Sequence, residues 1–365
     1  MGNIHLTHRE KKLLNAIGTN PNSSMEELLS YTGYKWASTV VKKLEQLKKQ
    51  FIYAGSTYDL NHEKLCRNPL HKLECIIETD QSYETVITYL KMIEPLLWIF
   101  PVLSPYKSVV LAGFLSSDDT EMIALFQLLK DNGIISDYII HTHCSKRIVE
   151  NPNFFGDPNP LLEGLLNPCE LPDMSLGCHD TEWNECDIMI LSYMQAGYED
   201  VKILEILREE KKLHSRSWTY EEVKYSRDKV IKNGLIEKKY AVFPFPVDQN
   251  TQFNLFIQSR DTTLTQRILC NFAKEERVYK EYALCEEWGM IYCVCHPSFV
   301  ADLMYKLDQI DEIKEKEMYQ IRTNPPVKYS FGRFPTYECY DLENQVMKYP
   351  YHVYREKIKE TLECG

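Results

Sequence analysis

The pattern of apolar and polar positions repeats along the chain. The segment that starts at Lys107 can be laid without gaps over the segment that starts at Trp288. Both contain an apolar strand, a polar break, an amphipathic helix, a charged turn and a second strand. Internal similarity of this kind decides the architecture, so we predict that the chain carries one two-part unit twice.

The first part of each unit is predicted to be three short helices followed by a ribbon. In copy one, capping boxes start at Thr7 and Ser24, where a hydroxyl and a carboxylate three residues apart satisfy each other's amides. Gly33 allows a tight turn before a third helix over residues 36–49. The following segment, FIYAGSTYDL, is predicted to form a small hairpin wing. This order is that of a winged helix-turn-helix.

The third helix of copy one has two different faces. Apolar side chains gather on one side at helical spacing, which predicts a core face. The opposite side carries lysines, hydroxyls and an amide, and it has no carboxylate. This composition suits a helix in the major groove of DNA. A solvated lysine face is the plainer interpretation. The residues predicted to bind DNA are Lys35, Trp36, Ser38, Thr39, Lys42, Lys43, Gln46 and Lys49.

The second part of each unit reads as strand, helix, strand, strand, helix, strand, the βαββαβ order of a ferredoxin-like domain. Five prolines then break regular structure between the two copies. The predicted fold class is α+β, with two copies of a winged helix-turn-helix followed by a ferredoxin-like domain. The predicted boundaries are 1–70 and 71–143 for copy one, 144–180 for a Pro-rich linker, 181–248 and 249–323 for copy two, and 324–365 for an aromatic-rich extension.

Charge is distributed unevenly over the 365 residues. The net charge is −11, but residues 1–67 hold ten Lys and Arg against six acids, which leaves an acidic remainder. A basic head of this kind can attract phosphates locally, because charges act over about 10 Å at 0.1 M salt. No apolar stretch reaches the roughly 18 residues of a membrane helix, and the first 20 residues lack an apolar signal segment. We therefore expect a cytoplasmic protein with no membrane partner and with reduced cysteines.

The order of elements resembles the Lrp/AsnC family of transcription regulators of archaea and bacteria, with two subunits fused in tandem. Ser38-Thr39-Val40, followed by Lys42, Lys43 and Leu44, is similar to the family's recognition helix. The resemblance implies a regulator that binds double-stranded DNA, with the two copies as a pseudo-dimer inside one chain and two chains as a homodimer. It also implies a small-molecule effector, although neither copy has a clean version of the family's glycine- and aspartate-bearing loop.

Copy two is expected to contribute less to DNA binding. Its third helix follows a capping box at Thr219 and carries Glu221 and Asp228 on the outward side, where carboxylates would oppose phosphates. The candidate contacts in this copy are Arg216, Ser217, Lys224 and Lys232. We predict that copy one dominates the affinity for DNA.

Two groups of residues offer alternatives with metal or enzyme chemistry. Cys293, Cys295 and His296 have ligand types that zinc prefers, and Cys270 and Cys285 could complete such a site. Alternation places the two sulfurs on the core face of a strand, so packing explains them without a metal. We therefore expect no cofactor.

The second group is His141-Thr-His143-Cys144, at the end of the first ferredoxin-like unit. Alternate histidines could bind a tetrapyrrole, since siroheme decarboxylases have the same frame, but histidines facing solvent at a sheet edge are the plainer interpretation. A binding module that has lost its DNA contact is a third alternative. We expect a regulator rather than an enzyme, with no catalytic residues, because no P-loop, GxGxxG, HExxH, GxSxG or CxxC motif is present.

Overall fold

The computed structural model describes residues 6–195, 202–214, 216–322, 330–333 and 335–364. The chain divides into two compact units that do not follow the two halves of the sequence. The first unit consists of residues 1–57, 145–175 and 238–320, and the second of residues 58–144, 176–237 and 321–365. Each unit therefore combines the helical part of one copy with the sheet of the other copy. The mixed α+β fold predicted from the sequence is confirmed.

Head one, the helical part of the first unit, consists of α1 (His8–Thr19), α2 (Met25–Thr32) and α3 (Ala37–Lys49). Both predicted capping boxes are present, and Gly33 ends α2 in the left-handed conformation with φ of 74°. The three helices enclose a small apolar core around Leu13, Leu14 and Val40. Phe154, from the segment predicted as a linker, completes this core.

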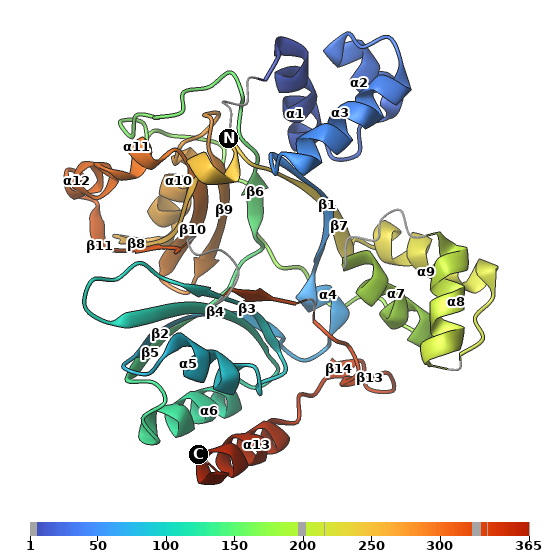
Figure 1. Ribbon diagram of the computed structural model, residues 1–365, viewed down its shortest axis with the longest axis vertical. Coiled ribbons are helices and arrows are strands. Elements are labelled where there is room, and N and C mark those ends of the chain that lie inside the picture. The colour runs from blue at the N-terminus through green and yellow to red at the C-terminus, as the bar shows by residue number, and fades with distance from the viewer. Residues whose placement is uncertain (1–5, 196–201, 215, 323–329, 334, 365) are drawn as a thin grey trace. The chain divides into compact units, whose positions relative to one another are not determined.

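Sheet two, in the first unit, has the strand order β11-β8-β10-β9-β6. Helix α10 packs against one of its faces (Figure 1) through a core that includes Phe253, Ile268 and Leu269. The elements around this sheet are β6 (Ile148–Glu150), η1 (Val247–Gln249), β8 (Thr251–Ser259), α10 (Thr262–Asn271), β9 (Tyr279–Cys285), β10 (Trp288–Cys295), α11 (Pro297–Val300), α12 (Leu303–Asp308) and β11 (Ile313–Gln320). The expected single helix over 298–310 is thus two short helices, and the expected linker supplies edge strand β6.

Sheet one, in the second unit, has the strand order β12-β3-β4-β2-β5. Helices α5 and α6 cover one face (Figure 1), where Cys75, Ile77 and Phe114 join the core. The elements are α4 (His62–Leu65), β2 (His71–Thr79), α5 (Tyr83–Leu90), β3 (Leu96–Pro101), β4 (Ser108–Ser116), α6 (Asp119–Asp131), β5 (Asp137–Thr142) and β12 (Phe331–Gly332). We call the opposite face, which α5 and α6 do not cover, the helix-free face of sheet one.

Head two, the helical part of the second unit, consists of α7 (Glu185–Gln195), α8 (Ile203–Leu213) and α9 (Tyr220–Lys232). The predicted capping box at Thr219 is present. The start expected for α8, near residue 199, lies outside the described residues.

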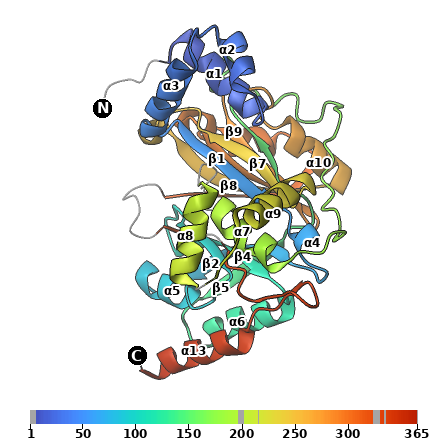
Figure 2. The same cartoon turned by 90° about the vertical axis from the view of Figure 1, so that its right-hand side faces the viewer.

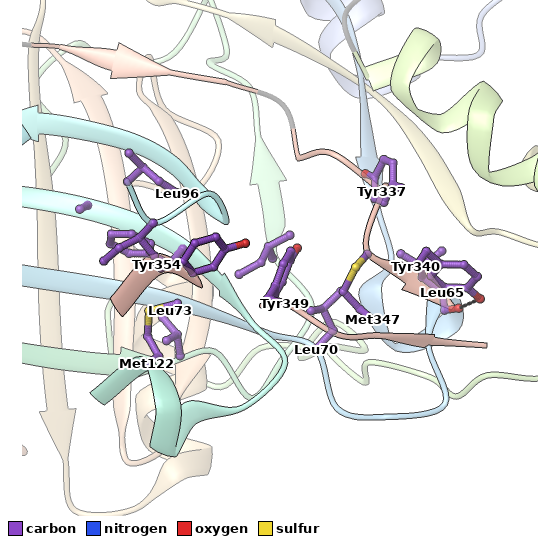
Figure 3. Close-up of a cluster of buried hydrophobic side chains, with 14 of the residues drawn as sticks. Leu65, Leu70, Leu73, Leu96, Met122, Tyr337, Tyr340, Met347, Tyr349 and Tyr354 are labelled. Atoms are coloured by element: carbon purple, nitrogen blue, oxygen red, sulfur yellow. Dashed lines mark hydrogen bonds between the residues drawn. The ribbon is translucent and has the colours of Figure 1, made fainter. Parts of the chain in front are cut away.

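The C-terminal segment belongs to the core of the second unit. It contains β13 (Tyr340–Asp341), β14 (Val346–Met347) and α13 (Tyr351–Cys364), and α13 lies beside α6 (Figure 2). Figure 3 shows its tyrosines among buried leucines, with the Tyr340 hydroxyl donating to the Leu65 carbonyl oxygen at 2.8 Å. Gln345 bonds to both backbone polar groups of Trp183, at the start of head two. The segment therefore ties head two to the core, which agrees with a packing role for its aromatic residues.

Neither predicted hairpin wing forms. Each copy instead contributes one strand, β1 (Tyr53–Leu60) and β7 (Ile236–Val242), and the two strands pair with each other. The ribbon is antiparallel, because Phe243 N–H donates to the Ile52 carbonyl oxygen while Asn61 N–H donates to that of Leu235. A strand from the other copy satisfies the same backbone groups as a local hairpin would, so sequence alone could not separate the two pairings.

The two sheets share an order of strands and helices, but their strand register differs from that of the gapless alignment. Strands β2 and β8 have nine residues each and the same order of buried positions after the first residue. Leu73 pairs with Phe114, whereas Phe253 pairs with Cys293. The gapless alignment matches Cys293 with Ala112. If β2 and β8 are equivalent, Cys293 matches Phe114 instead. The shift is two residues, so the assignment of faces is unchanged.

Candidate functional site

The helix-free face of sheet one carries a row of four residues in register. Trp98 pairs with Gly113, Gly113 with Glu74, and Glu74 with His141, across strands β3, β4, β2 and β5. Directly opposed residues point to the same face, and neighbours of Glu74 along β2 point into the helical core. We call these four residues the Glu74 row.

Glu74 and two imidazoles form a buried acid and base set in this row. Glu74 is 2% exposed, His141 8% and His143 7%. The Nε2 atom of His143 lies 3.5 Å from Oε2 of Glu74, and His141 is the cross-strand neighbour of Glu74. The plainer expectation from sequence, that these histidines face solvent, is therefore wrong. The reason is that burial at a sheet edge depends on what covers the strand, which strand alternation does not encode.

The surroundings of Glu74 show its electrostatic influence. Cys75, the next residue, is fully buried on the opposite face. Burial raises the pKa of its thiol well above the ordinary value, and the Glu74 carboxylate raises it further. Ile139, two residues before His141 on the same face of edge strand β5, remains 44% exposed. Strand β5 is thus exposed toward Asp137 and buried at His141.

Sequence reasoning missed three members of the row, Trp98, Gly113 and Glu74. A carboxylate inside the apolar run LECII was one available signal, because a buried strand seldom carries an acid without a partner. Gly113 inside a strand was another, since it marks close approach of a neighbouring group. Neither signal identifies the partner, which comes from another strand.

The second candidate site is the outer face of α3. Lys35, Ser38, Lys42, Gln46 and Lys49 are exposed there, and Trp36 is 68% exposed. Thr39 is half-buried. Helical spacing predicts Val41 on the core side, but it is 45% exposed. The face therefore offers several cations that DNA phosphates could contact.

Lys43 has a different role within head one. Its Nζ lies 2.9 Å from Oε1 of Glu10, a residue of α1 that is 6% exposed. Burial would raise the pKa of Glu10, but hydrogen bonds from Thr7 and Lys43 outweigh it and hold the pKa below its usual range. Lys43 therefore links α3 to α1 through an ion pair.

We expect the Glu10 to Lys43 link to be sensitive to acid. The pKa of Glu10 is lowered by folding, so its contribution is present above about pH 4.3 and is lost as the pH falls through the lowered value. Glu10→Gln should destabilise head one by about 2 kcal/mol at pH 7, and the effect should shrink as the pH falls through the lowered pKa of Glu10. Hydrogen exchange of α1 and α3 amides in both proteins measures this. Glu26→Gln, at an exposed position, is the control, and an effect of Glu10→Gln that does not shrink as the pH falls would contradict the assignment.

Copy two uses its candidate DNA contacts differently. Arg216 Nη2 lies 3.0 Å from Oε1 of Glu185, and its Nη1 lies 3.7 Å from Oε2 of buried Glu210. Ser217, Lys224 and Lys232 are exposed. Arg216 therefore already has two carboxylate partners within head two.

The structure does not bring the cysteine candidates together as a metal site. Cys293 and Cys295 are buried in the core under sheet two, while the His296 ring caps α11 by accepting from the Ser298 amide. Cys270 and Cys285 are also buried. Among the residues that the structure describes, no group of three His, Cys, Asp or Glu side chains could hold a metal ion. Packing thus accounts for these cysteines.

In the part of the chain that the structure describes, no helix is both long and apolar enough to cross a membrane.

Comparisons with known proteins support the fold. No family model and no curated protein sequence matches the chain. Among solved structures, siroheme decarboxylase NirDL matches 98% of this chain and 100% of its own, with a TM-score of 0.54 and 10% identity. The same enzyme in complex with an iron-uroporphyrin III analogue matches 97% of this chain and 100% of its own, with a TM-score of 0.53 and 10% identity.

Regulators match only part of the chain. AsnC of E. coli matches 38% of this chain and 92% of its own, with a TM-score of 0.30 and 16% identity. At these identities the likeness concerns the fold alone. The matches that span nearly the whole chain are to structures of an enzyme, and they support the fold.

Proposed function

We propose that the protein is an enzyme that removes CO2 from a carboxylate side chain of a tetrapyrrole. The observation that carries this proposal is the buried set of Glu74, His141 and His143 on the helix-free face of sheet one. Buried imidazoles beside a carboxylate are groups suited to proton transfer. A siroheme decarboxylase has the same overall fold, which supplies a precedent for the substrate class.

The reaction needs one proton at the right place. When an R–CH2–COO⁻ group loses CO2, the electron pair of the broken C–C bond remains on carbon, and a proton must be added there to give R–CH3. Imidazole is suited to donate it because its ordinary pKa of about 6.5 lies near neutrality. We assign proton donation to His141, which is the cross-strand neighbour of Glu74 in the row. Glu74, which lies 3.5 Å from His143 and opposite His141, would position both imidazoles.

The direct test is an anoxic incubation of the purified chain with siroheme, followed by mass spectrometry of the tetrapyrrole. The expected result is a product lighter by one or more molecules of CO2, with a shifted Soret band. Heat-inactivated protein is the control. Recovery of unchanged siroheme from active, folded preparations would reject this function.

We propose DNA binding through head one as a second function, because α3 presents exposed lysines and hydroxyls on one side. Phosphate contacts from these lysines would supply affinity, and Ser38 and Thr39 would contact bases. In this second proposal, one polypeptide acts as an internal pseudo-dimer, because it carries two heads and two sheets. The proposal also includes a homodimer of chains and a small-molecule effector.

Exchanging two lysines tests the DNA proposal. Lys42→Glu with Lys49→Glu should abolish binding to the chain's own upstream DNA, because two attractive charges become repulsive. At low salt, where residual binding can still be measured, the salt slope should fall by about 1.8, about 0.9 for each lost phosphate contact. Filter binding over a salt series measures both effects. Lys314→Glu with Lys359→Glu, at exposed positions outside head one, is the matched control. Equal binding by both double variants would exclude α3 as the docking face.

A further inference from the structure

The first observation is that the Trp98 indole occupies the space next to the Gly113 backbone where a side chain would begin. A Cβ atom added to Gly113 would come within 2.5 Å of the indole atoms Cε2 and Nε1. Real Cβ atoms essentially never lie so close to another side chain, so only glycine permits this position of the ring. Because Gly113 and Glu74 are directly opposed, the indole lies on the helix-free face beside Glu74.

A second ring extends the same surface. Phe100, two residues after Trp98 on β3, stacks with the indole at a centroid distance of 5.2 Å and an interplanar angle of 25°. Both rings are half-buried, so neither is enclosed in the helical core. Together Trp98 and Phe100 form an aromatic plate next to the acid and imidazole set. We use the name aromatic plate for these two rings.

The dimensions of the row suit a flat ligand. From Trp98 to His141 the row crosses three strand spacings, about 14 Å. A planar conjugated ring that stacks on the indole could therefore reach with a peripheral carboxylate toward His141. Stacking on aromatic faces is favourable for conjugated rings and does not require hydrogen bonds from the ring itself.

Sheet two lacks this arrangement at the equivalent positions. If β8 is equivalent to β2, the corresponding row is Glu281, Tyr292, Asn254 and Tyr319. Tyr292 occupies the place of Gly113, and its hydroxyl donates to Gln252 Oε1 at 3.2 Å. The side chain at this position occupies the space that an indole takes over Gly113 in sheet one. The plate is thus particular to sheet one.

We infer that the aromatic plate of Trp98 and Phe100 over Gly113 is the stacking subsite for the tetrapyrrole ring, which places a ring carboxylate beside His141. This assignment deepens the proposed decarboxylase function and rests on it. Gly113 acts by positioning Trp98, because it is the residue that lets the indole lie on the sheet.

Ferric uroporphyrin III is the probe for this subsite, with binding measured by Soret titration and by quenching of tryptophan fluorescence. Trp98→Ala and Gly113→Ala should each weaken binding by at least about tenfold. Trp98→Phe should retain affinity within a few-fold but lose the quenching that comes from this indole.

Two matched controls separate the plate from general effects. Gly332→Ala changes a glycine of β12 that pairs with Trp98, and its added Cβ would meet no atom within 4 Å. Trp36→Ala removes an exposed indole in head one. Both controls should bind the probe as the unaltered protein does. Circular dichroism verifies folding, and if Trp98→Ala fails to fold, Gly113→Ala and Trp98→Phe decide.

The outcomes distinguish this inference from the function on which it rests. If the unaltered protein binds the probe and converts siroheme but Gly113→Ala and the folded Trp98 variants keep full affinity and quenching, the subsite is wrong and the function stands. If the unaltered protein neither binds the probe nor converts siroheme, both proposals are rejected. Loss of affinity in Gly113→Ala, with Gly332→Ala unaffected, supports the plate.

Discussion

His141→Ala is expected to reduce the rate of tetrapyrrole decarboxylation by about 10²- to 10⁴-fold, the usual contribution of a general acid. The imidazole is 8% exposed beside Glu74, and alanine cannot deliver the proton that replaces CO2. Single-turnover conversion of siroheme, followed by mass spectrometry, gives the rate. Soret titration with ferric uroporphyrin III gives the affinity, which should change little because the aromatic plate remains.

His352→Ala is the matched control for this experiment, since His352 is exposed on α13 and lies outside the Glu74 row. It should convert siroheme at the rate of the unaltered protein. If His141→Ala retains more than half of that rate, His141 is not the proton donor. If it loses both rate and affinity, its contribution is to binding, and the assignment of proton transfer is withdrawn.

Lys280→Met is expected to have the largest effect on stability, about 3–5 kcal/mol. Lys280 is 1% exposed and donates to the carbonyl oxygens of Leu269, Cys270 and Phe272, at the end of α10. These carbonyls have no partner within the helix, so one ammonium group satisfies three orphan acceptors. Its Nζ also lies 3.2 Å from Oε2 of Glu150.

Two opposing influences act on the pKa of Lys280. Burial lowers the pKa of Lys280, and the opposed Glu150 carboxylate on β6 counteracts this. Methionine keeps the volume of the side chain but leaves the carbonyls and Glu150 without their donor. Hydrogen exchange of amides in α10 and β9 measures the free energy of opening. The control is Lys314→Met at an exposed position, expected within about 0.5 kcal/mol of the unaltered protein. A similarly small effect at Lys280 would contradict the structural role.

Local patterns predicted most elements correctly because the interactions that define them are local. The capping boxes at Thr7, Ser24 and Thr219 depend on residues three apart, and all three form. Apolar periodicity in the sequence predicts a helix over residues 119–131, and α6 has these bounds. Helix boundaries were less accurate where the sequence gives weaker stop signals, as in the division between α11 and α12.

Pairings between distant segments could not be predicted in the same way. A strand presents the same alternation whether it folds into a hairpin or pairs with a segment far along the chain, so the β1 and β7 ribbon was mistaken for two wings. The same limit applies to the compact units, in which each head is grouped with the sheet of the other copy. The pairing of β1 with β7 and the grouping of heads with sheets both depend on contacts between segments that are far apart in the sequence.

The candidate site shows most clearly the difference between local features and contacts between distant segments. Sequence identified His141 and His143 as a pair at alternate positions of one strand, which is a local property. Their burial, their proximity to Glu74 and the seating of Trp98 on Gly113 involve three further strands. Thus the sequence by itself determined the α+β class, the repeated order of elements and the basic face of α3. Only the tertiary structure decided the strand register that assembles the Glu74 row, because residues on different strands become neighbours only when the sheet forms.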